Sequence, residues 1–281
     1  MRSQRVVVVL VSLALLAGFG YWVAQQARPL PLMRSGAECT VEADGQVRLD
    51  GDQMANAATI AATGFRLDMP ERAIVVALAT ALQESKLRNL PHLGAWNDHD
   101  SIGLFQQRPS QGWGSADEIS DPRYAAERFY RALSQVRGWH RLRVTDAAQR
   151  VQRSAFPEAY EKWAADATVL TDALVGRAGG AVACRVAGGP ARSAAADTVR
   201  AELSRDWGEV ATVTSDSEDA WVRVGADGKR AGWRYAHWLV SYAAALGVTR
   251  VHFSDLEWHA TTGSWHVSDS VRDHVHAELG A

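Results

Sequence analysis

The pattern of hydrophobic and polar positions predicts that the first part of the chain is helical. The alanine-rich stretch 53–63 fits a helix that ends at Gly64. Asp68, with Glu71 three positions later, forms a capping-box pattern that predicts the start of a second helix. Residues 74–82 of this second helix, IVVALATAL, are apolar on nearly every face. Such a helix is typical of the centre of a domain rather than of its surface.

More helices are expected beyond a connecting loop. Residues 89–108 contain glycine and proline without helical periodicity, which fits a loop or a short hairpin. Asp121 before Pro122 predicts an N-cap followed by proline at the first helical position. Thr145 is expected to cap another helix, and the Phe-Pro pair at residue 156 separates it from a last helix.

The final part of the chain has a mixed pattern. Residues 176–196 carry paired glycines and fit a linker. Beyond it, the stretches 221–224 and 251–253 suit strands, and 233–246 suits a helix between them. We therefore expect a small α/β (α+β) domain at the C-terminal end.

The N-terminal segment is typical of a membrane anchor. Residues 6–24 form an uncharged apolar run that would span about 28 Å as a helix, close to one hydrocarbon core. Arg2 and Arg5 precede the run, which predicts a cytoplasmic N-terminus and an extracytoplasmic remainder. A cleaved signal peptide is the alternative, but the run is long for one and lacks a good cleavage site. We therefore expect a single-pass protein of the cell membrane.

These patterns together predict the fold class and the domain boundaries. The length of 281 residues suits one or two globular domains. We expect a mainly α domain followed by a small α/β (α+β) domain, with an N-terminal transmembrane helix. The predicted segments are a cytoplasmic stub and anchor at 1–24, a tether at 25–37, the helical domain at 38–184, a linker at 185–196 and the small domain at 197–281.

Charge and cysteine content narrow the range of partners. The chain has 30 Lys and Arg residues and 32 Asp and Glu residues. The resulting formal net charge of −2 does not favour binding to nucleic acid. A polar polymer such as a glycan fits better, and no cofactor is predicted. Cys39 and Cys184 permit one disulfide bond in an oxidising compartment. Two free buried thiols are the alternative.

Glu84 is the main candidate for acid–base chemistry. It directly follows the apolar stretch of the second helix, where burial and the negative end of the helix dipole both favour a protonated carboxyl group. A carboxylic acid that stays protonated near neutral pH is what protonation of a glycosidic oxygen requires. A solvated glutamate at a helix end is the alternative.

Two short motifs resemble a known superfamily. Glu84-Ser85, followed by residues 103–106 (GLFQ), is similar to the E-S and G-L-M-Q motifs of goose-type lysozymes and lytic transglycosylases, in a bacterial branch. The resemblance covers roughly residues 39–184. It implies a lysozyme-like, mainly α-helical fold with a cleft for the sugar polymer of peptidoglycan. It also implies that Glu84 is the general acid and that Gln106 faces the sugar.

Further residues are expected in the same cleft. The predicted substrate-binding residues are Ser85, Gln106, Gln107, Trp113 and Gln152. The A-Y-N-x-G motif of transglycosylases is missing, and residues 147–152 are expected to take its place. Stacking of Trp113 on a sugar and packing of Trp113 in the core are equally consistent with the sequence.

The sequence leaves the reaction outcome open. Hydrolysis with inversion needs a second carboxylate, for which Asp98 and Asp100 are the candidates. Loop aspartates that cap backbone amides are the alternative. Lytic transglycosylases do without a second carboxylate, because groups of the substrate assist. Both a hydrolase and an anhydro-forming lyase therefore fit.

The C-terminal histidines raise the question of a metal site. Six of the nine histidines lie at or after His237. His274-x-His276 and the preceding tryptophan-rich stretch resemble the C-terminal half of zinc D,D-peptidase-like domains. A catalytic zinc needs three protein ligands, and no upstream histidine between residues 178 and 237 supplies the third. We therefore expect a peptidase-like domain without metal. His274 and His276 are the candidate ligands for the alternative, a zinc-binding domain.

The leading hypothesis is a membrane-anchored, extracytoplasmic muramidase or lytic transglycosylase that cleaves the β-1,4 glycan strand of peptidoglycan. The second hypothesis is a non-catalytic module that binds the cell wall or acts as a scaffold. A zinc peptidase in the C-terminal domain is the third. The expected partners are peptidoglycan strands and the cytoplasmic membrane, through residues 6–24, and nucleic acid is not among them.

Overall fold

The structure of the chain is a computed structural model. It describes residues 36–91, 100–190, 194–208, 213–215 and 221–280. The predicted anchor at 6–24 and Asp98 lie outside these ranges. In the described ranges, no helix combines the length and apolar character needed to cross a membrane.

The chain folds as an α+β protein with two small antiparallel sheets. The helices are α2 (Gly51–Arg66), α3 (Glu71–Ser85), α4 (Ala116–Ile119), α5 (Pro122–Ser134), α6 (Val144–Gln152), α7 (Ala164–Leu174), α8 (Ala196–Trp207), α9 (Lys229–Ser241) and α10 (Ala243–Leu246). Short 3-10 turns are η2 (Pro109–Gln111), η3 (Trp139–Arg141) and η4 (Glu161–Trp163). The strands are β1 (Ala37–Glu42), β2 (Gln46–Asp50), β3 (Val182–Val186), β4 (Val213–Ser215), β5 (Trp221–Val224), β6 (Val248–His259) and β7 (Ser264–Leu279).

Helix α3 lies at the centre of the helical part, as its apolar sequence predicts. Its residues from Ile74 to Leu82 are buried apart from Val75, and the helix packs against α2, α5, α6 and α7. The predicted capping box at its start is wrong. The N-cap is Pro70, which makes no side-chain cap, and Asp68 has a left-handed backbone with φ of 52°. The turn between the two helices, rather than a side-chain cap, sets where α3 begins.

Two other predicted helix boundaries differ from the structure. Gly64 lies inside α2, where a Cβ atom would meet the Tyr130 hydroxyl at 2.7 Å, so glycine permits close packing there. Thr145 lies in the first turn of α6 instead of capping it, and its backbone N–H donates to Glu161 at 2.9 Å. The prediction for Asp121 is confirmed, because its side chain accepts from the backbone N–H of Arg123 at the start of α5.

The first sheet joins the two ends of the helical part. Its strand order is β2-β1-β3, and Cys39 on β1 lies directly opposite Cys184 on β3. The two cysteines form a disulfide bond across 145 residues, with their Cα atoms 4.0 Å apart, so the predicted bridge is confirmed. The interpretation of 176–196 as a linker is wrong, because β3 lies within it. Strand β3 has only five residues, and its alternation of buried and exposed side chains is short. The glycines on both sides of it made the whole segment resemble a linker.

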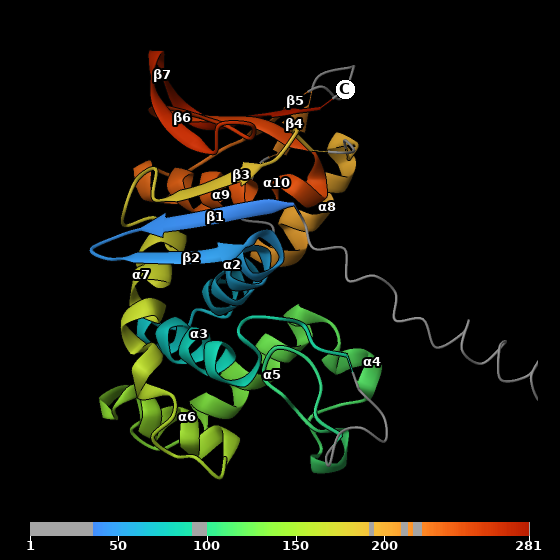
Figure 1. The fold of residues 1–281 in the computed structure, drawn as a ribbon, viewed down its shortest axis with the longest axis vertical. Coiled ribbons are helices and arrows are strands. Elements are labelled where there is room, and N and C mark those ends of the chain that lie inside the picture. Colours follow the sequence, from blue (N-terminus) through green and yellow to red (C-terminus); the bar gives the residue numbers. More distant parts are fainter. Residues whose placement is uncertain (1–35, 92–99, 191–193, 209–212, 216–220, 281) are drawn as a thin grey trace, which may run out of the picture. The chain divides into compact units, whose positions relative to one another are not determined.

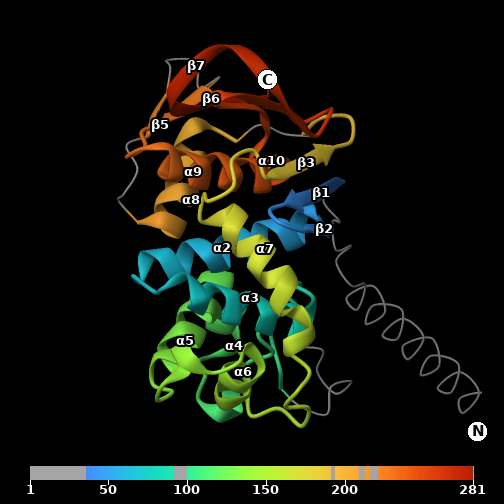
Figure 2. The same cartoon turned by 90° about the vertical axis from the view of Figure 1, so that its left-hand side faces the viewer.

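The second sheet and its helices pack onto the first part of the chain. The strand order is β4-β5-β7-β6, and α9 packs against β6 and β7 of this sheet and against β3 (Figures 1 and 2). Helix α9 also contacts α2 and α7. The described residues belong to one compact unit. The predicted strands at 221–224 and 251–253 are confirmed as β5 and part of β6, and the predicted helix at 233–246 corresponds to α9 and α10.

Two buried polar groups connect the C-terminal part to the helices before it. Asp206 of α8 is fully buried and accepts hydrogen bonds from Arg123 at 2.5 Å and Trp238 at 2.6 Å. His237 of α9 is equally buried, with Nδ1 2.8 Å from the carbonyl oxygen of Ala173 and Nε2 accepting from the N–H of Ala181 at 3.0 Å. Burial lowers the pKa of His237 to about 4, so the ring is neutral.

Candidate active site

Glu84 lies in the last turn of α3, where two side chains from later parts of the chain hold its carboxyl group. The Tyr160 hydroxyl donates to Oε1 at 2.7 Å. Nε2 of Gln152 donates to the same oxygen at 3.2 Å and to the carbonyl oxygen of Phe105 at 2.7 Å. Burial, together with the neighbouring Glu84, raises the pKa of Tyr160. Its hydroxyl therefore stays protonated and serves as a donor.

Both hydrogen bonds reach one oxygen of the Glu84 carboxyl group. Oε2 has no hydrogen-bond partner among the residues that the structure describes. The Glu84 side chain itself is half-buried, between the core and an open groove. A carboxyl group fixed through one oxygen and free at the other can exchange a proton with a bound substrate in a defined direction.

A groove with a volume of about 940 Å³ runs past Glu84. It is formed by the end of α3, the loop before η2, and the C-terminal ends of α5 and α6. The described residues that line it are Glu84, Ser101, Gln106, Gln107, Arg108, Gln111, Trp113, Ala132, Gln135, Val136, Arg150, Val151, Gln152, Arg153, Ser154, Ala155 and Phe156. Glu84 is the only carboxylate in this set, and five of the others are glutamines. Such a wall suits a polar ligand with many hydroxyl or amide groups.

The GLFQ segment forms a tight turn along this groove. Gly103 and Gln106 both have left-handed backbones, with φ of 74° and 48°, and Nε2 of Gln106 donates to the Gly103 carbonyl oxygen at 3.0 Å. Gln107 is 2% exposed, and its Nε2 donates to the carbonyl oxygen of Ala125 at 3.1 Å. Oε1 of Gln107 is buried without a partner in the described part of the chain.

Ser85 does not line the groove. It is buried, and its hydroxyl lies 2.8 Å from the Leu104 carbonyl oxygen and 3.1 Å from that of Ala81. Ser85 therefore connects the GLFQ turn to the end of α3 by a hydrogen bond.

Asp100 is not among the residues that line the groove. Its carboxylate accepts from the backbone N–H of Ser110 at 2.8 Å and from the Ser110 hydroxyl at 2.9 Å. These hydrogen bonds hold the pKa of Asp100 below its usual range. Asp100 thus acts as a loop aspartate that caps backbone, the alternative that the sequence left open. The other candidate, Asp98, lies outside the described residues.

Trp113 both lines the groove and packs against the core. Its indole is half-buried, and its carbonyl oxygen accepts from Arg128 at 3.1 Å and from Tyr124 at 3.3 Å. Phe156, which is 73% exposed, also lines the groove. Two aromatic rings are therefore available along the groove for stacking against sugar rings.

The sequence interpretation missed several residues of this site. Tyr160 is separated from Glu84 by 76 residues and carries no motif, so only the fold reveals their contact. Arg108, Arg150 and Arg153 also line the groove and were not predicted. Gln152 was expected in the cleft, and Arg150 and Arg153 are close to it in the sequence. This proximity was the only sequence feature that could have indicated the two arginines.

The C-terminal histidines contact protein groups. The His276 ring lies 5.2 Å from the Trp221 indole, and Nδ1 of His274 is 2.8 Å from Asp273. Burial and the nearby Arg272 lower the pKa of His276 to about 4. Within the described ranges, no group of three or more His, Cys, Asp or Glu residues could hold a metal ion. These residues therefore do not fit a three-ligand zinc site.

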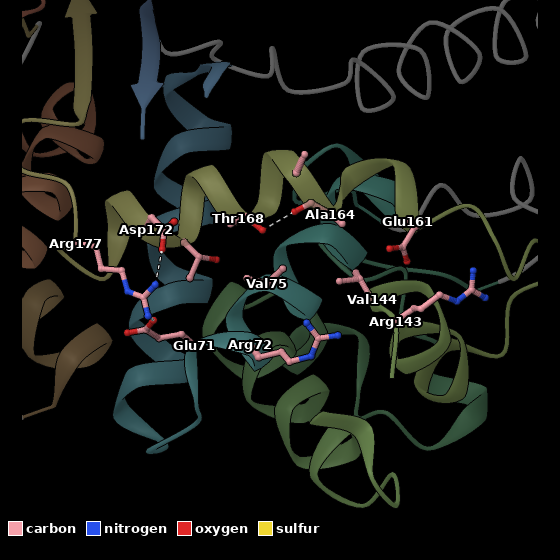
Figure 3. Close-up of a pocket in the computed structure, with 12 residues that line it drawn as sticks. Glu71, Arg72, Val75, Arg143, Val144, Glu161, Ala164, Thr168, Asp172 and Arg177 are labelled. Atoms are coloured by element: carbon pink, nitrogen blue, oxygen red, sulfur yellow. Dashed lines mark hydrogen bonds and ion pairs between the residues drawn. The ribbon is translucent and has the colours of Figure 1, made fainter. Parts of the chain in front are cut away.

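A second cavity lies on another face of α3 (Figure 3). Its volume is about 520 Å³, and it is lined by the start of α3, by α7 and by the segment at the start of α6. Arg177 pairs with Glu71 and with Asp172 at its edge. Arg143, also at this cavity, pairs with Asp146 at 2.9 Å and Glu158 at 3.1 Å. Both arginines are therefore paired with carboxylates.

No protein-family model matches the chain. No curated protein matches it either.

Proposed function

We propose that this protein cleaves the β-1,4 glycan strand of peptidoglycan, with Glu84 as the general acid. The observation that carries the proposal is the Glu84 carboxyl group, held by Tyr160 and Gln152 through Oε1 at the wall of a large polar groove. The resemblance of the E-S and GLFQ segments to goose-type lysozymes and lytic transglycosylases supports the same reaction. The glutamines and the Trp113 and Phe156 rings of the groove suit a strand of sugars.

The proposed reaction begins with proton transfer from Glu84. The proton moves from Oε2 to the glycosidic oxygen, the bond between that oxygen and the sugar C1 breaks, and the leaving sugar departs with a new 4-hydroxyl group. The positive charge at C1 is then captured by the oxygen of a water molecule or by the 6-hydroxyl of the same sugar. The oxygen that has bonded to C1 gives up one proton, which returns to Glu84. Water yields a reducing end, and the 6-hydroxyl yields a 1,6-anhydro end.

The lining of the groove supports the anhydro-forming route. Inverting hydrolysis requires a second carboxylate that activates water. Asp100 is bound to Ser110 instead, and Glu84 is the only carboxylate among the described residues of the groove. We therefore propose a lytic transglycosylase from the position of Asp100, and the products of the reaction distinguish it from a muramidase that would use Asp98.

The proposed site of action is the outer side of the cytoplasmic membrane. The disulfide bond between Cys39 and Cys184 supports an oxidising compartment. The apolar run at 6–24 supports attachment to the membrane, with the described residues facing the cell wall.

The experiment that tests the proposal uses the full chain, purified in detergent, on isolated glycan strands. Mass analysis of the products should find 1,6-anhydro ends, and Glu84→Gln should lower the rate by about 100-fold or more. Glu42→Gln, which removes an exposed carboxylate on β1, is the matched control and should keep the rate. Reducing ends would point to the muramidase instead. Binding to insoluble peptidoglycan without any product, or an unchanged rate in Glu84→Gln, would replace the enzyme with a wall-binding module.

A further inference from the structure

Three arginines in the groove have no acidic partner. Arg108, Arg150 and Arg153 all line the groove, and none of them forms an ion pair with a carboxylate of the described residues. Arg108 donates from Nε to the Ser101 hydroxyl at 3.2 Å, and Arg150 lies 3.5 Å from the carbonyl oxygen of Arg137. With Glu84 as the only acid in the described lining, the groove carries an excess of positive charge.

The second cavity shows how this chain satisfies arginines elsewhere. There, Arg177 pairs with Glu71 and Asp172 (Figure 3). Arg143 pairs with Asp146 and Glu158, which lie outside the lining of the cavity. Acidic residues also occur beside the groove, but their carboxylates are bound by other protein groups. Asp100 is held by Ser110, and Asp146 is held by Arg143. Asp100 is still attracted by Arg108, and Asp146 by Arg150, but neither pair forms an ion pair. The guanidinium groups of the groove can therefore still bind an external anion.

The backbone at Arg153 gives a second, independent indication. Arg153 is the C-cap of α6 and has a left-handed backbone with φ of 54°. Glycine is the usual residue at such a position, because a side chain is disfavoured in this conformation. The position nevertheless carries a long cationic side chain that opens onto the groove next to Gln152. Backbone strain kept at a binding surface favours a role for the side chain itself.

We infer that Arg108, Arg150 and Arg153 bind carboxylates of the substrate, so that the groove selects an acidic glycan over a neutral one. This inference rests on the proposed function and names its substrate class more closely. Arginine presents paired N–H donors that match the two oxygens of a carboxylate. In peptidoglycan, a carboxylate can come from the lactyl group of a strand without peptides, or from the free carboxylates of the stem peptides. A neutral polymer of N-acetylglucosamine offers neither.

The test measures binding rather than cleavage, on full-length protein with Glu84→Gln to prevent turnover. Three ligands are compared: peptide-free glycan strands, the same strands with their lactyl carboxylates converted to methylamides, and strands that carry stem peptides. Arg153→Gly removes the guanidinium group and relieves the left-handed strain, so the fold should be preserved. Arg150→Gln removes a second charge, and Arg48→Gln on the exposed face of β2 is the charge-matched control.

We expect Arg153→Gly and Arg150→Gln each to raise the Kd for carboxylate-bearing strands by about 5- to 20-fold, while Arg48→Gln leaves it unchanged. Methylamide strands should bind weakly and equally to all variants. A loss on peptide-free strands identifies the lactyl group as the carboxylate, and a loss confined to peptide-bearing strands identifies the stem peptide. Equal binding of all three ligands, or no effect of either arginine variant on any of them, would overturn the inference. Because no turnover is involved, this result is separate from failure of the cleavage assay.

Discussion

The hydroxyl of Tyr160 donates a hydrogen bond of 2.7 Å to Oε1 of Glu84, across 76 residues of sequence. Tyr160 is fully buried, so its position depends on the core and not on solvent. The contact means that the turn between α6 and α7 fixes the orientation of a carboxyl group at the end of α3. The proposed acid is therefore positioned by a part of the chain that carries no motif.

Tyr160→Phe should remove this positioning without unfolding the protein. Loss of one hydrogen bond to a carboxyl group corresponds to about 1.5–3 kcal/mol, so we expect kcat on glycan strands to fall by about 10- to 100-fold. KM should change little, because the Tyr160 hydroxyl does not line the groove. Steady-state kinetics on glycan strands measure both parameters.

Tyr130→Phe is the matched control for this variant. Tyr130 is also buried, and its hydroxyl donates to the Ile60 carbonyl oxygen at 2.9 Å, away from Glu84. Both variants should lower the thermal midpoint by a similar amount, but only Tyr160→Phe should lower kcat. Equal losses of kcat in both would show that Tyr160 acts through general stability alone.

The buried ring of His237 should make folding stability depend on pH. The folded pKa of about 4 lies below the unfolded value near 6.5, so the neutral ring stabilises the fold at high pH. This contribution is fully present above pH 6.5 and is lost as the pH falls through 4. Over that range it amounts to about 3 kcal/mol.

Urea unfolding of the wild type and His237→Gln at pH 7 and pH 4 measures this contribution. The free energy of unfolding should fall more steeply with acid in the wild type than in the variant. If the variant does not fold, the imidazole titration followed by NMR in the wild type gives the same information. Protonation of the His237 ring near pH 6.5 in the folded state would contradict the prediction.

The disulfide bond should be a major source of stability. It closes a loop of 145 residues, for which the chain-entropy model gives a contribution of up to about 5 kcal/mol. Replacing Cys39 and Cys184 by serine together should lower the urea midpoint, and reduction of the wild type should produce the same shift. A reducing agent should have no effect on the double variant. An unchanged midpoint in the double variant would mean that the strand pairing of β1 with β3 suffices.

The sequence predicted the elements whose patterns are long or carry a strong local signal. The apolar run of α3 and the Asp-Pro start of α5 fall into this class, because burial on all sides and proline at the first turn leave few alternatives. The small first sheet was missed. Strands β1, β2 and β3 are five or six residues long, and the glycines after residue 176 resemble a linker. Their pairing depends on contacts between residues far apart in the chain.

The sequence indicated the residues of the candidate site that belong to recognisable motifs. It did not indicate the residues that support them. Glu84, Gln106, Gln107, Trp113 and Gln152 come together in one groove, as the resemblance to the lysozyme-like superfamily implies. Tyr160 and the three groove arginines could not be found, because nothing local marks a tyrosine or an arginine as facing a distant carboxyl group. Asp100 was a reasonable candidate by position, but its hydrogen bonds to Ser110 became visible only in three dimensions.

The contacts of His237 with Ala173 and Ala181 bear on how this protein can change over evolution. An imidazole from the C-terminal half completes the backbone pairing of the segment that leads into β3, so the two halves share one interior. A shuffling event that exchanged residues after Cys184 for an unrelated sequence would strip a backbone N–H and a carbonyl group of their partners. We therefore expect that the C-terminal half cannot be exchanged for an unrelated sequence without loss of stability in the helices before it.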